Sequence, residues 1–157
     1  MDSRIELNEN LLSLLNNKDK NQLNYIDLFC GIGGFHQAFK KLSKSTNINF
    51  NCILACDIDK ACRETYQNNY GIEVFPDVKN ITPEDIKGVD IICGGFPCQP
   101  FSNGGKKKTF EDDRGLLFDE IMRLAVDSKP KFMFLENVKH ILKVGNGEVI
   151  EYIRKRI

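Results

Sequence analysis

Cys98 stands between Pro97 and Pro100, in the stretch 94–102 that directly follows the apolar run 90–93. Proline fixes its own φ angle and restricts the residue before it, so we expect Cys98 in a stiff turn at the end of a strand. A thiol held rigidly at the carboxyl edge of a parallel sheet is well placed to act as a nucleophile. The other interpretation of this segment is a buried cysteine in a tight loop, because free cysteines are often simply packed.

A glycine cluster, Gly31–Gly34, lies between a strand-like run and a segment with helical spacing. Glycines in such a turn allow the backbone to approach a ligand closely. The cluster is not the dinucleotide-binding fingerprint, because His36 stands where that pattern needs its third glycine. Asp57 ends the next apolar run, where an acid would bind the hydroxyls of a ligand's ribose. Alternatively, Asp57 or Asp59 caps the helix that follows.

Two more carboxylates follow apolar runs. Asp77 comes just after Phe75 and Pro76, where it could reach a ligand from a third strand end or simply cap a loop. Glu136 follows the run 131–135, at the same predicted sheet edge as Cys98. A carboxylate there is costly to bury unless it is paired or protonated, and a protonated one would suit a proton donor. Capping of the next helix is the alternative for Glu136.

The stretch 102–115 is rich in glycine and carries three lysines (106–108) and Arg114. This composition predicts a mobile lid that closes over a phosphate backbone. The acidic run 111–113 favours the alternative, a solvated charged loop.

The elements that must position these residues alternate along the chain. Strands are predicted at 24–29, 50–56, 73–75, 89–93 and 131–135, the last of them buried. Helices are predicted at 35–42, 60–69, 116–126 and 147–157, and residues 82–85 are predicted to open a further brief helix. Short strands alternating with helices are typical of a parallel sheet with crossover helices, so the predicted fold class is α/β. Residues 1–22 are predicted to form a polar N-terminal arm, and residues 23–157 a single domain.

Bulk composition narrows the class of protein. The chain has 157 residues, 41% of them hydrophobic and 28% charged, as expected for one globular domain. No apolar run approaches the roughly 20 residues that span a bilayer, and the polar start does not resemble a secretory signal, which together predict a cytoplasmic protein without a membrane partner. The formal net charge is zero, so any contact with nucleic acid must come from a local patch or another chain.

The six cysteines indicate reduced thiols rather than a disulfide framework. Most lie in apolar or periodic segments, where they would pack as small hydrophobic residues. There is no C-x-x-C pair and no histidine-rich partner set, so no metal site is expected.

Taken in order, these motifs resemble those of the DNA (cytosine-5) methyltransferases over about residues 25–142. The matching residues are Asp27-Leu28-Phe29-x-Gly31-x-Gly33-Gly34, Asp57, Asp77, Pro97-Cys98-Gln99-Pro100-Phe101-Ser102 and Glu136-Asn137-Val138. Pro-Cys-Gln and Glu-Asn-Val are the most specific of them. The resemblance implies a Rossmann-like S-adenosylmethionine-dependent methyltransferase fold, with an incomplete parallel sheet and flanking helices, that methylates C5 of cytosine in DNA.

The resemblance also implies roles for individual residues. Cofactor binding is implied for Phe29, Gly31, Ile32, Gly33, Gly34, Asp57, Ile58, Asp77 and Pro97. Asp57 would bind the ribose hydroxyls, Ile58 would lie against adenine, and Asp77 would hold the adenine amino group. Cys98 would add to C6 of a flipped-out cytosine while Glu136 protonates N3. Contacts with the DNA substrate are implied for Gln99, Ser102, Lys106 and Asn137.

The family pattern also contains features that this sequence lacks, namely a Gln-x-Arg-x-Arg motif after Asn137 and a variable target-recognition region. We therefore expect the N-terminal catalytic part of an enzyme of a restriction-modification system, completed by a second polypeptide. A non-catalytic remnant that only binds cofactor or a partner is one alternative. A tRNA-directed relative with the same Pro-Cys-Gln core is another.

Overall fold

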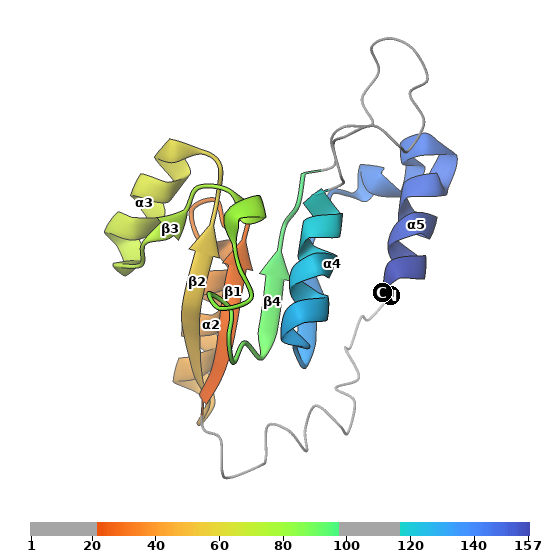
Figure 1. The fold of residues 1–157 in the computed structure, drawn as a ribbon. Helices are drawn as coiled ribbons and strands as arrows, with labels where there is room; N and C mark the ends of the chain where they lie inside the picture. The colour runs from red at the N-terminus through yellow and green to blue at the C-terminus, as the bar shows by residue number, and fades with distance from the viewer. Residues whose placement is uncertain (1–21, 98–116) are drawn as a thin grey trace.

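The computed structural model describes residues 22–97 and 117–157. Four predicted site residues, Cys98, Gln99, Ser102 and Lys106, lie outside the described residues. The described chain forms a five-stranded sheet in the order β3-β2-β1-β4-β5, in which every neighbouring pair is parallel. Figure 1 shows β2, β1 and β4 side by side. The predicted α/β class and parallel sheet are confirmed.

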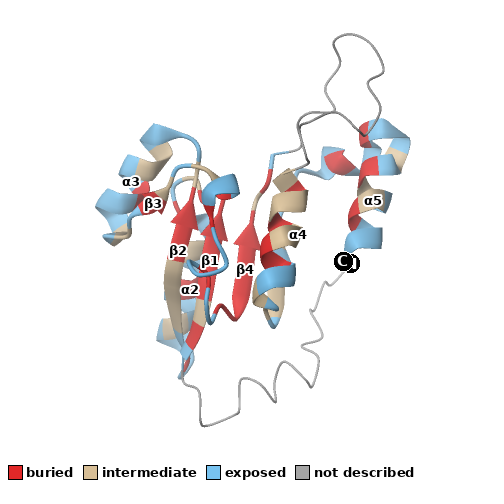
Figure 2. Ribbon diagram, in the orientation of Figure 1, coloured by how far each residue is buried: buried red, intermediate tan, exposed pale blue. Residues whose placement is uncertain are grey.

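The strands lie close to the predicted runs, at β1 (Gln22–Leu28), β2 (Asn49–Cys56), β3 (Val74–Phe75), β4 (Ile91–Gly94) and β5 (Phe132–Leu135). β1 is central and pairs with β2 on one side and β4 on the other, so that Tyr25 is in register with both Cys52 and Ile91. A central strand of a parallel sheet is covered on both faces, which explains why consecutive residues of β1 are buried (Figure 2).

The helices are α2 (Gly34–Ser45), α3 (Lys60–Tyr70), α4 (Leu117–Ser128) and α5 (Glu148–Arg156), with 3-10 segments η1 (Val78–Asn80) and η2 (Lys139–Gly147). Their ends follow local chemistry, as α3 illustrates. Its N-terminus is capped by the Asp59 carboxylate, which accepts hydrogen bonds from the N–H groups of Ala61 and Cys62. It ends at Gly71, whose φ of 69° is the left-handed geometry that glycine favours. Of the two predicted capping candidates, Asp59 therefore caps α3.

The sheet separates two apolar layers. Ile26 and Leu28 of β1 belong to the larger core, which includes Ile121 of α4 and residues of η2 and α5. Leu23 and Tyr25, on alternate positions of the same strand, pack with Phe39 of α2 on the opposite face. This two-sided burial holds the ends of β1, β2 and β4 rigidly at one edge of the sheet.

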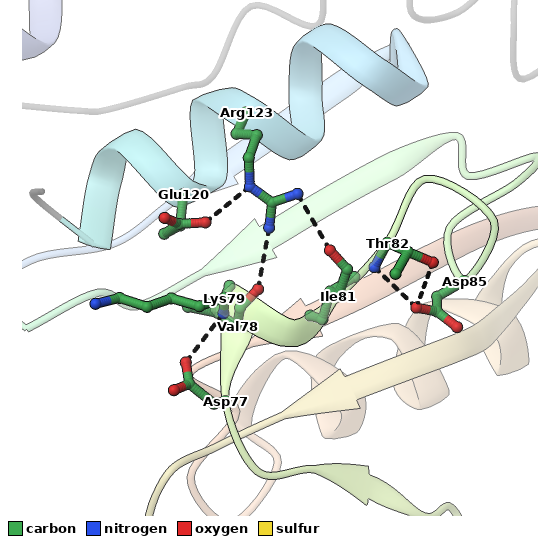
Figure 3. Close-up of polar contacts among 8 residues, drawn as sticks. All are labelled: Asp77, Val78, Lys79, Ile81, Thr82, Asp85, Glu120 and Arg123. Atoms are coloured by element: carbon green, nitrogen blue, oxygen red, sulfur yellow. Dashed lines mark hydrogen bonds and ion pairs between the residues drawn. The ribbon is translucent and has the colours of Figure 1, made fainter.

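Two predictions about elements are wrong. Residues 82–85 do not form a helix; they form a turn in which the Asp85 carboxylate accepts hydrogen bonds from both the N–H and the hydroxyl of Thr82 (Figure 3). The fifth strand is less buried than predicted, because β5 lies at the edge of the described sheet and Phe134 is 45% exposed. Within residues 22–97 and 117–157, no helix is long and apolar enough to cross a membrane.

Candidate functional site

The predicted ligand-binding residues meet at the carboxyl edge of β1, β2 and β3. Parallel strands end at the same edge of a sheet, and main-chain hydrogen bonds join the segments just beyond these three ends. The Cys30 N–H donates to the Cys56 carbonyl, and the Asp57 N–H donates to the Phe75 carbonyl, both at 3.0 Å. The glycine turn, Asp57 and Asp77 consequently lie on neighbouring strand ends, as the sequence predicts.

Asp57 organises the glycine turn. Its Oδ2 accepts a 2.8 Å hydrogen bond from the Gly31 N–H, and its Oδ1 accepts one of the same length from the Asp59 N–H. The half-buried carboxylate thus links the end of β2 to the turn after β1. Each carboxylate oxygen has more than one lone pair, so Asp57 retains the capacity to accept hydroxyl donors from a ligand. The contact between Asp57 and Gly31 was not predicted from the sequence.

Tyr70 fixes the shape of the glycine turn from the end of α3. Its hydroxyl donates to the Ile32 carbonyl at 3.2 Å. Gly33 has a φ of 97°, and a Cβ at this position would clash with Cε2 of the Tyr70 ring. Gly33 is therefore required both by its backbone angle and by the tyrosine beside it. Sequence reasoning missed Tyr70, which lies just beyond the predicted helix 60–69.

Phe29 precedes this turn with a φ of 56°, in the left-handed region that non-glycine residues rarely adopt. Such angles cost free energy, of order 1–3 kcal/mol, and they are concentrated at functional sites. The strain at Phe29 lies at the predicted site and directs the chain from β1 into the glycine turn.

Apolar side chains are exposed beside these carboxylates. Ile32 is 66% exposed and Ile58 is 80% exposed. Together with Asp57 and Asp77, they offer apolar surface and negative charge at one sheet edge. This combination fits a ligand that has a flat apolar ring, hydroxyl groups and a positive charge. The described residues contain no group of three or more His, Cys, Asp or Glu side chains that could hold a metal ion.

Asp77 caps the short 3-10 segment η1. Its Oδ1 accepts a 3.0 Å hydrogen bond from the Lys79 N–H (Figure 3). The loop-capping role that sequence reasoning left open is therefore present in the structure. It engages one oxygen of the carboxylate and sets the orientation of the other.

The ends of β4 and β5 form the rest of the carboxyl edge of the sheet. The Glu136 N–H donates to the Gly94 carbonyl at 3.0 Å, and the Asn137 side-chain amide donates to the Phe96 carbonyl at 2.7 Å. Glu136 Oε2 lies 3.4 Å from the point that a Cβ on Gly95 would occupy. The structure thus brings Glu136 and Asn137 against the segment that leads into Pro97 and Cys98. Glu136 is exposed, and it does not cap η2, whose N-cap is Val138.

Beneath the glycine turn lies a buried polar network that sequence reasoning did not predict. Asp27 is fully buried, and this burial raises its pKa to about 7 against the opposing effect of hydrogen bonds from the Tyr66 hydroxyl and the His36 backbone. The Tyr66 hydroxyl donates to Asp27 Oδ2 at 3.2 Å. His36 Nδ1 lies 3.0 Å from the hydroxyls of both Tyr66 and Tyr25. Burial, with a smaller effect of Lys40, lowers the pKa of His36 and favours its neutral form.

The cysteines of the described segments are free thiols, as predicted. Burial is the main cause of the raised pKa of these thiols, which reaches about 11 for Cys52 and about 12 for Cys56. The pKa values of Cys30 and Cys93 are raised further, in both cases chiefly by burial. A protonated thiol is a poor nucleophile, so these four cysteines are packing residues rather than reactive groups.

Comparison with known proteins matches residues 23–157 to the family model described as C-5 cytosine-specific DNA methylase. The type II methyltransferase M.HhaI of Haemophilus parahaemolyticus is 38% identical over 140 residues, which are 89% of this chain and 41% of that protein. The type II methyltransferase M1.ScrFI of Lactococcus lactis subsp. cremoris is 41% identical over 128 residues, or 82% of this chain and 32% of that protein.

Solved structures give a concordant result. A DNMT2 variant from Spodoptera frugiperda superposes with a TM-score of 0.65 at 26% identity, covering 85% of this chain and 40% of that one. The Dnmt2 methyltransferase of S. pombe gives a TM-score of 0.64 at 25% identity. These neighbours support the predicted Rossmann-like fold. The chain spans 31–41% of the length of the curated relatives it matches.

Proposed function

The chain belongs to the C-5 cytosine-specific DNA methylase family, and on that basis we propose that it methylates C5 of cytosine in DNA with S-adenosylmethionine as the methyl donor. One structural observation carries the proposal. The same sheet edge joins a glycine turn and two carboxylates to Glu136, which lies against the segment leading into Cys98. A cofactor site and a nucleophile with its proton donor are the two parts that this reaction needs.

The residues at the β1–β3 ends suit this cofactor. When bound, S-adenosylmethionine supplies a methyl group activated by a sulfonium charge. In the proposal, Asp57 binds the ribose hydroxyls, Ile58 lies against adenine and Asp77 holds the adenine amino group. The remaining lining residues are Phe29, Gly31, Ile32, Gly33, Gly34 and Pro97. The exposed apolar surface of Ile58, beside two carboxylates and a turn with open backbone at Gly31, supports this assignment.

Cys98 and Glu136 are proposed to activate the base. C5 of cytosine is too weak a nucleophile to attack a sulfonium methyl group unaided. Addition of the Cys98 thiolate to C6, with a proton from Glu136 to N3, makes C5 nucleophilic. C5 then takes the methyl group and loses its proton to solvent water. The Cys98–C6 bond breaks as the thiolate leaves, and N3 returns its proton to Glu136. The base must first be flipped out of the duplex, because these atoms are inaccessible within the stack.

The other thiols support Cys98 as the nucleophile. Cys30, Cys52, Cys56 and Cys93 are unsuited to attack, because burial keeps them protonated at neutral pH. Contacts with the DNA are proposed for Gln99, Ser102, Lys106 and Asn137. The first three follow Cys98 in the sequence, and Asn137 bonds to the Phe96 carbonyl just before it.

The proposal includes a partner. The relatives that this chain matches are more than twice its length, and they carry the name type II methyltransferase. We propose that a second polypeptide supplies the arginine motif and the target-recognition region, and that the assembly serves a restriction-modification system.

A covalent-trapping experiment tests the proposed function. The chain, alone and with a candidate partner, is incubated with labelled cofactor and DNA that carries 5-fluorocytosine, which blocks the final elimination. We expect a protein–DNA adduct that Cys98→Ser abolishes and that Cys62→Ser leaves intact, since Cys62 lies on α3. If no adduct forms even with a verified partner, the catalytic proposal is wrong and a chain that only binds cofactor or a partner is favoured.

A further inference from the structure

Arg123 reaches from α4 to the loop that contains Asp77. Its Nη1 donates to the Ile81 carbonyl at 3.1 Å, and its Nη2 donates to the Val78 carbonyl at 3.2 Å (Figure 3). Its Nε donates to Glu120 Oε2 at 2.8 Å, so a partner on its own helix fixes the plane of the guanidinium. A planar guanidinium presents its donors in a rigid fork, and here two of them hold the carbonyls that flank one turn of chain.

The segment that Arg123 holds is η1, which is only three residues long. A single 3-10 turn has little stability of its own, because few hydrogen bonds offset the entropy of ordering it. The internal bonds of this turn run from the Asn80 N–H to the Asp77 carbonyl at 3.1 Å and from the Ile81 N–H to the Val78 carbonyl at 3.3 Å. Contacts from outside must therefore contribute to its shape, and Arg123 provides two of them together with the burial of the Val78 and Ile81 side chains.

Asp77 is the residue whose position depends on this turn. Its carboxylate is oriented by the Lys79 N–H, which is part of η1. Movement of η1 would move the donor that fixes Oδ1, and the second carboxylate oxygen would move with it. Arg123 and Asp77 are 46 residues apart in sequence, yet Arg123 lies one hydrogen bond away from the segment that Asp77 caps.

We propose that Arg123 is a positioning residue that sets the adenine selectivity of the cofactor site by holding η1 and thereby Asp77. This inference rests on the proposed function, in which Asp77 receives the adenine amino group. A carboxylate accepts a hydrogen bond from an amino group but repels a carbonyl oxygen. A ligand that carries hypoxanthine in place of adenine presents such a carbonyl, so selectivity between the two depends on an accurately placed Asp77.

The charge of Arg123 is not sufficient for this role. The two carbonyls and Glu120 are bound by three separate N–H groups of one rigid plane. The ammonium group of a lysine is a compact point charge on a flexible stem and does not reproduce that fork. We therefore expect Arg123→Lys to lose much of the selectivity for adenine over hypoxanthine, and we expect the same of Arg123→Gln.

The chain offers a matched control in Arg154. Its Nη1 donates to Glu151 Oε1 at 2.9 Å, so it forms an arginine–glutamate pair at the same three-residue spacing as Glu120 and Arg123. The Arg154 pair is exposed on α5 and is remote in sequence from η1. Arg154→Gln removes an equivalent surface pair and leaves the Asp77 loop unchanged.

The first experiment follows amide hydrogen exchange in the free chain by NMR. Arg123→Gln should accelerate exchange of the Lys79 and Ile81 amides about tenfold or more, because their hydrogen bonds depend on η1. Arg154→Gln should leave both rates unchanged. Unchanged exchange at these amides in Arg123→Gln would contradict the proposal, whatever the ligand results.

The second experiment measures binding of S-adenosylhomocysteine and of its hypoxanthine analogue by equilibrium dialysis. We expect the wild-type chain to prefer the adenine compound, and Arg123→Gln and Asp77→Ala each to reduce that preference about tenfold or more. The Arg123→Gln/Asp77→Ala double variant should match Asp77→Ala, because both changes act through one carboxylate. Equal losses of affinity for the two compounds, or additive losses of preference, would mean that Arg123 has only a structural role.

The outcomes separate this inference from the proposed function. A wild-type chain that binds neither compound would contradict the proposed cofactor site, and with it the role given to Arg123. A wild-type chain that binds with adenine selectivity, and that Arg123→Gln leaves equally selective, would overturn the inference alone.

Discussion

The side-chain amide of Asn137 donates a 2.7 Å hydrogen bond to the main-chain carbonyl of Phe96, two residues before Cys98. This bond crosses from the end of β5 to the end of β4. The neighbouring bond from the Glu136 N–H to the Gly94 carbonyl joins the same two strand ends. The segment that leads to the proposed nucleophile, Cys98, is therefore hydrogen-bonded to the segment that carries the proposed proton donor, Glu136.

Replacing Asn137 tests this connection. We expect Asn137→Ala to lower the free energy of unfolding by about 1 kcal/mol, since the part-buried hydrogen bond to the Phe96 carbonyl is lost together with the exposed one from the Val138 N–H. Adduct formation with 5-fluorocytosine DNA should slow about tenfold or more, because the Cys98 segment loses its restraint. Urea denaturation and adduct kinetics measure the two effects. Asn68→Ala, on the exposed face of α3, is the control, and an equal slowing there would argue against the restraint.

The two glycines at the start of α2 should respond very differently to the same substitution. A Cβ on Gly33 would clash with the Tyr70 ring and would also sit at a φ of 97°, whereas a Cβ on Gly34 would meet nothing within 4 Å. Gly33→Ala is expected to cost about 2–4 kcal/mol of stability. Gly34→Ala is expected to be neutral or stabilising by up to about 1 kcal/mol, since alanine is the better helix former. Thermal unfolding of both variants measures the two changes in stability, and equal losses of stability would contradict the role of Tyr70.

Asp27 should make stability fall as the pH rises. Its folded pKa of about 7 lies above the ordinary aspartate value of about 3.9, mainly because the carboxyl is buried. The unfolded chain ionises this group above about pH 4, whereas the folded chain keeps the proton until about pH 7. The contribution of Asp27 to the free energy of unfolding is thus largest below about pH 4. It declines by at most about 1.4 kcal/mol per pH unit between about pH 4 and pH 7, and it stays constant above about pH 7.

Urea denaturation of the wild-type chain and of Asp27→Asn, compared from pH 5 to pH 8, measures this effect. The variant cannot titrate at this position, so the difference between the two curves isolates Asp27. A difference that stays constant with pH would show that Asp27 is ionised in the folded chain.

Thiol reactivity should distinguish Cys98 from the packed cysteines. Burial raises the pKa of Cys30, Cys52, Cys56 and Cys93, so their reaction with iodoacetamide at pH 8 should be much slower in the folded chain than in urea. We expect Cys98→Ser to remove the fastest phase, as resolved by peptide mass spectrometry. Cys62→Ser is the comparison, since Cys62, unlike Cys52, packs against none of the apolar clusters of the described residues. Fast labelling of Cys56 or Cys93 would contradict their assignment as packing residues.

The parts of the fold that were predictable from sequence are those set by local pattern. Apolar runs mark the strands, and the glycine at position 71 marks the end of α3. Because parallel strands share a carboxyl edge, the meeting of the glycine turn with Asp57 and Asp77 followed from strand order alone. The helix predicted to begin at Thr82–Asp85 is wrong, because the local sequence pattern there is misleading. Its proline and acidic residues resemble a helix start, yet the Asp85 carboxylate closes on Thr82 and the chain turns at once toward β4.

The features that could not be predicted depend on contacts between residues distant in sequence. Tyr70 bonds to the Ile32 carbonyl across 38 residues, and Arg123 bonds to the Val78 carbonyl across 45. Neither side chain belongs to a recognisable motif, and each is ordinary for the helix that carries it. Which carbonyl such a side chain meets is decided by how α3 and α4 pack on the sheet. The predicted residues are therefore those proposed to contact the ligand, and the unpredicted ones shape the loops that carry them.

The central position of β1 has a consequence for biosynthesis. β1 and its neighbour β2 are close in sequence, but its other neighbour is separated by 66 residues, the distance from Tyr25 to Ile91. A nascent chain that has released only β1, β2 and β3 presents one edge of β1 with its main-chain groups unpaired. Such an edge is a template for pairing with another chain. We expect that the interval before β4 leaves the ribosome is when this protein is most exposed to aggregation, and that slower translation across residues 76–90 lowers its yield.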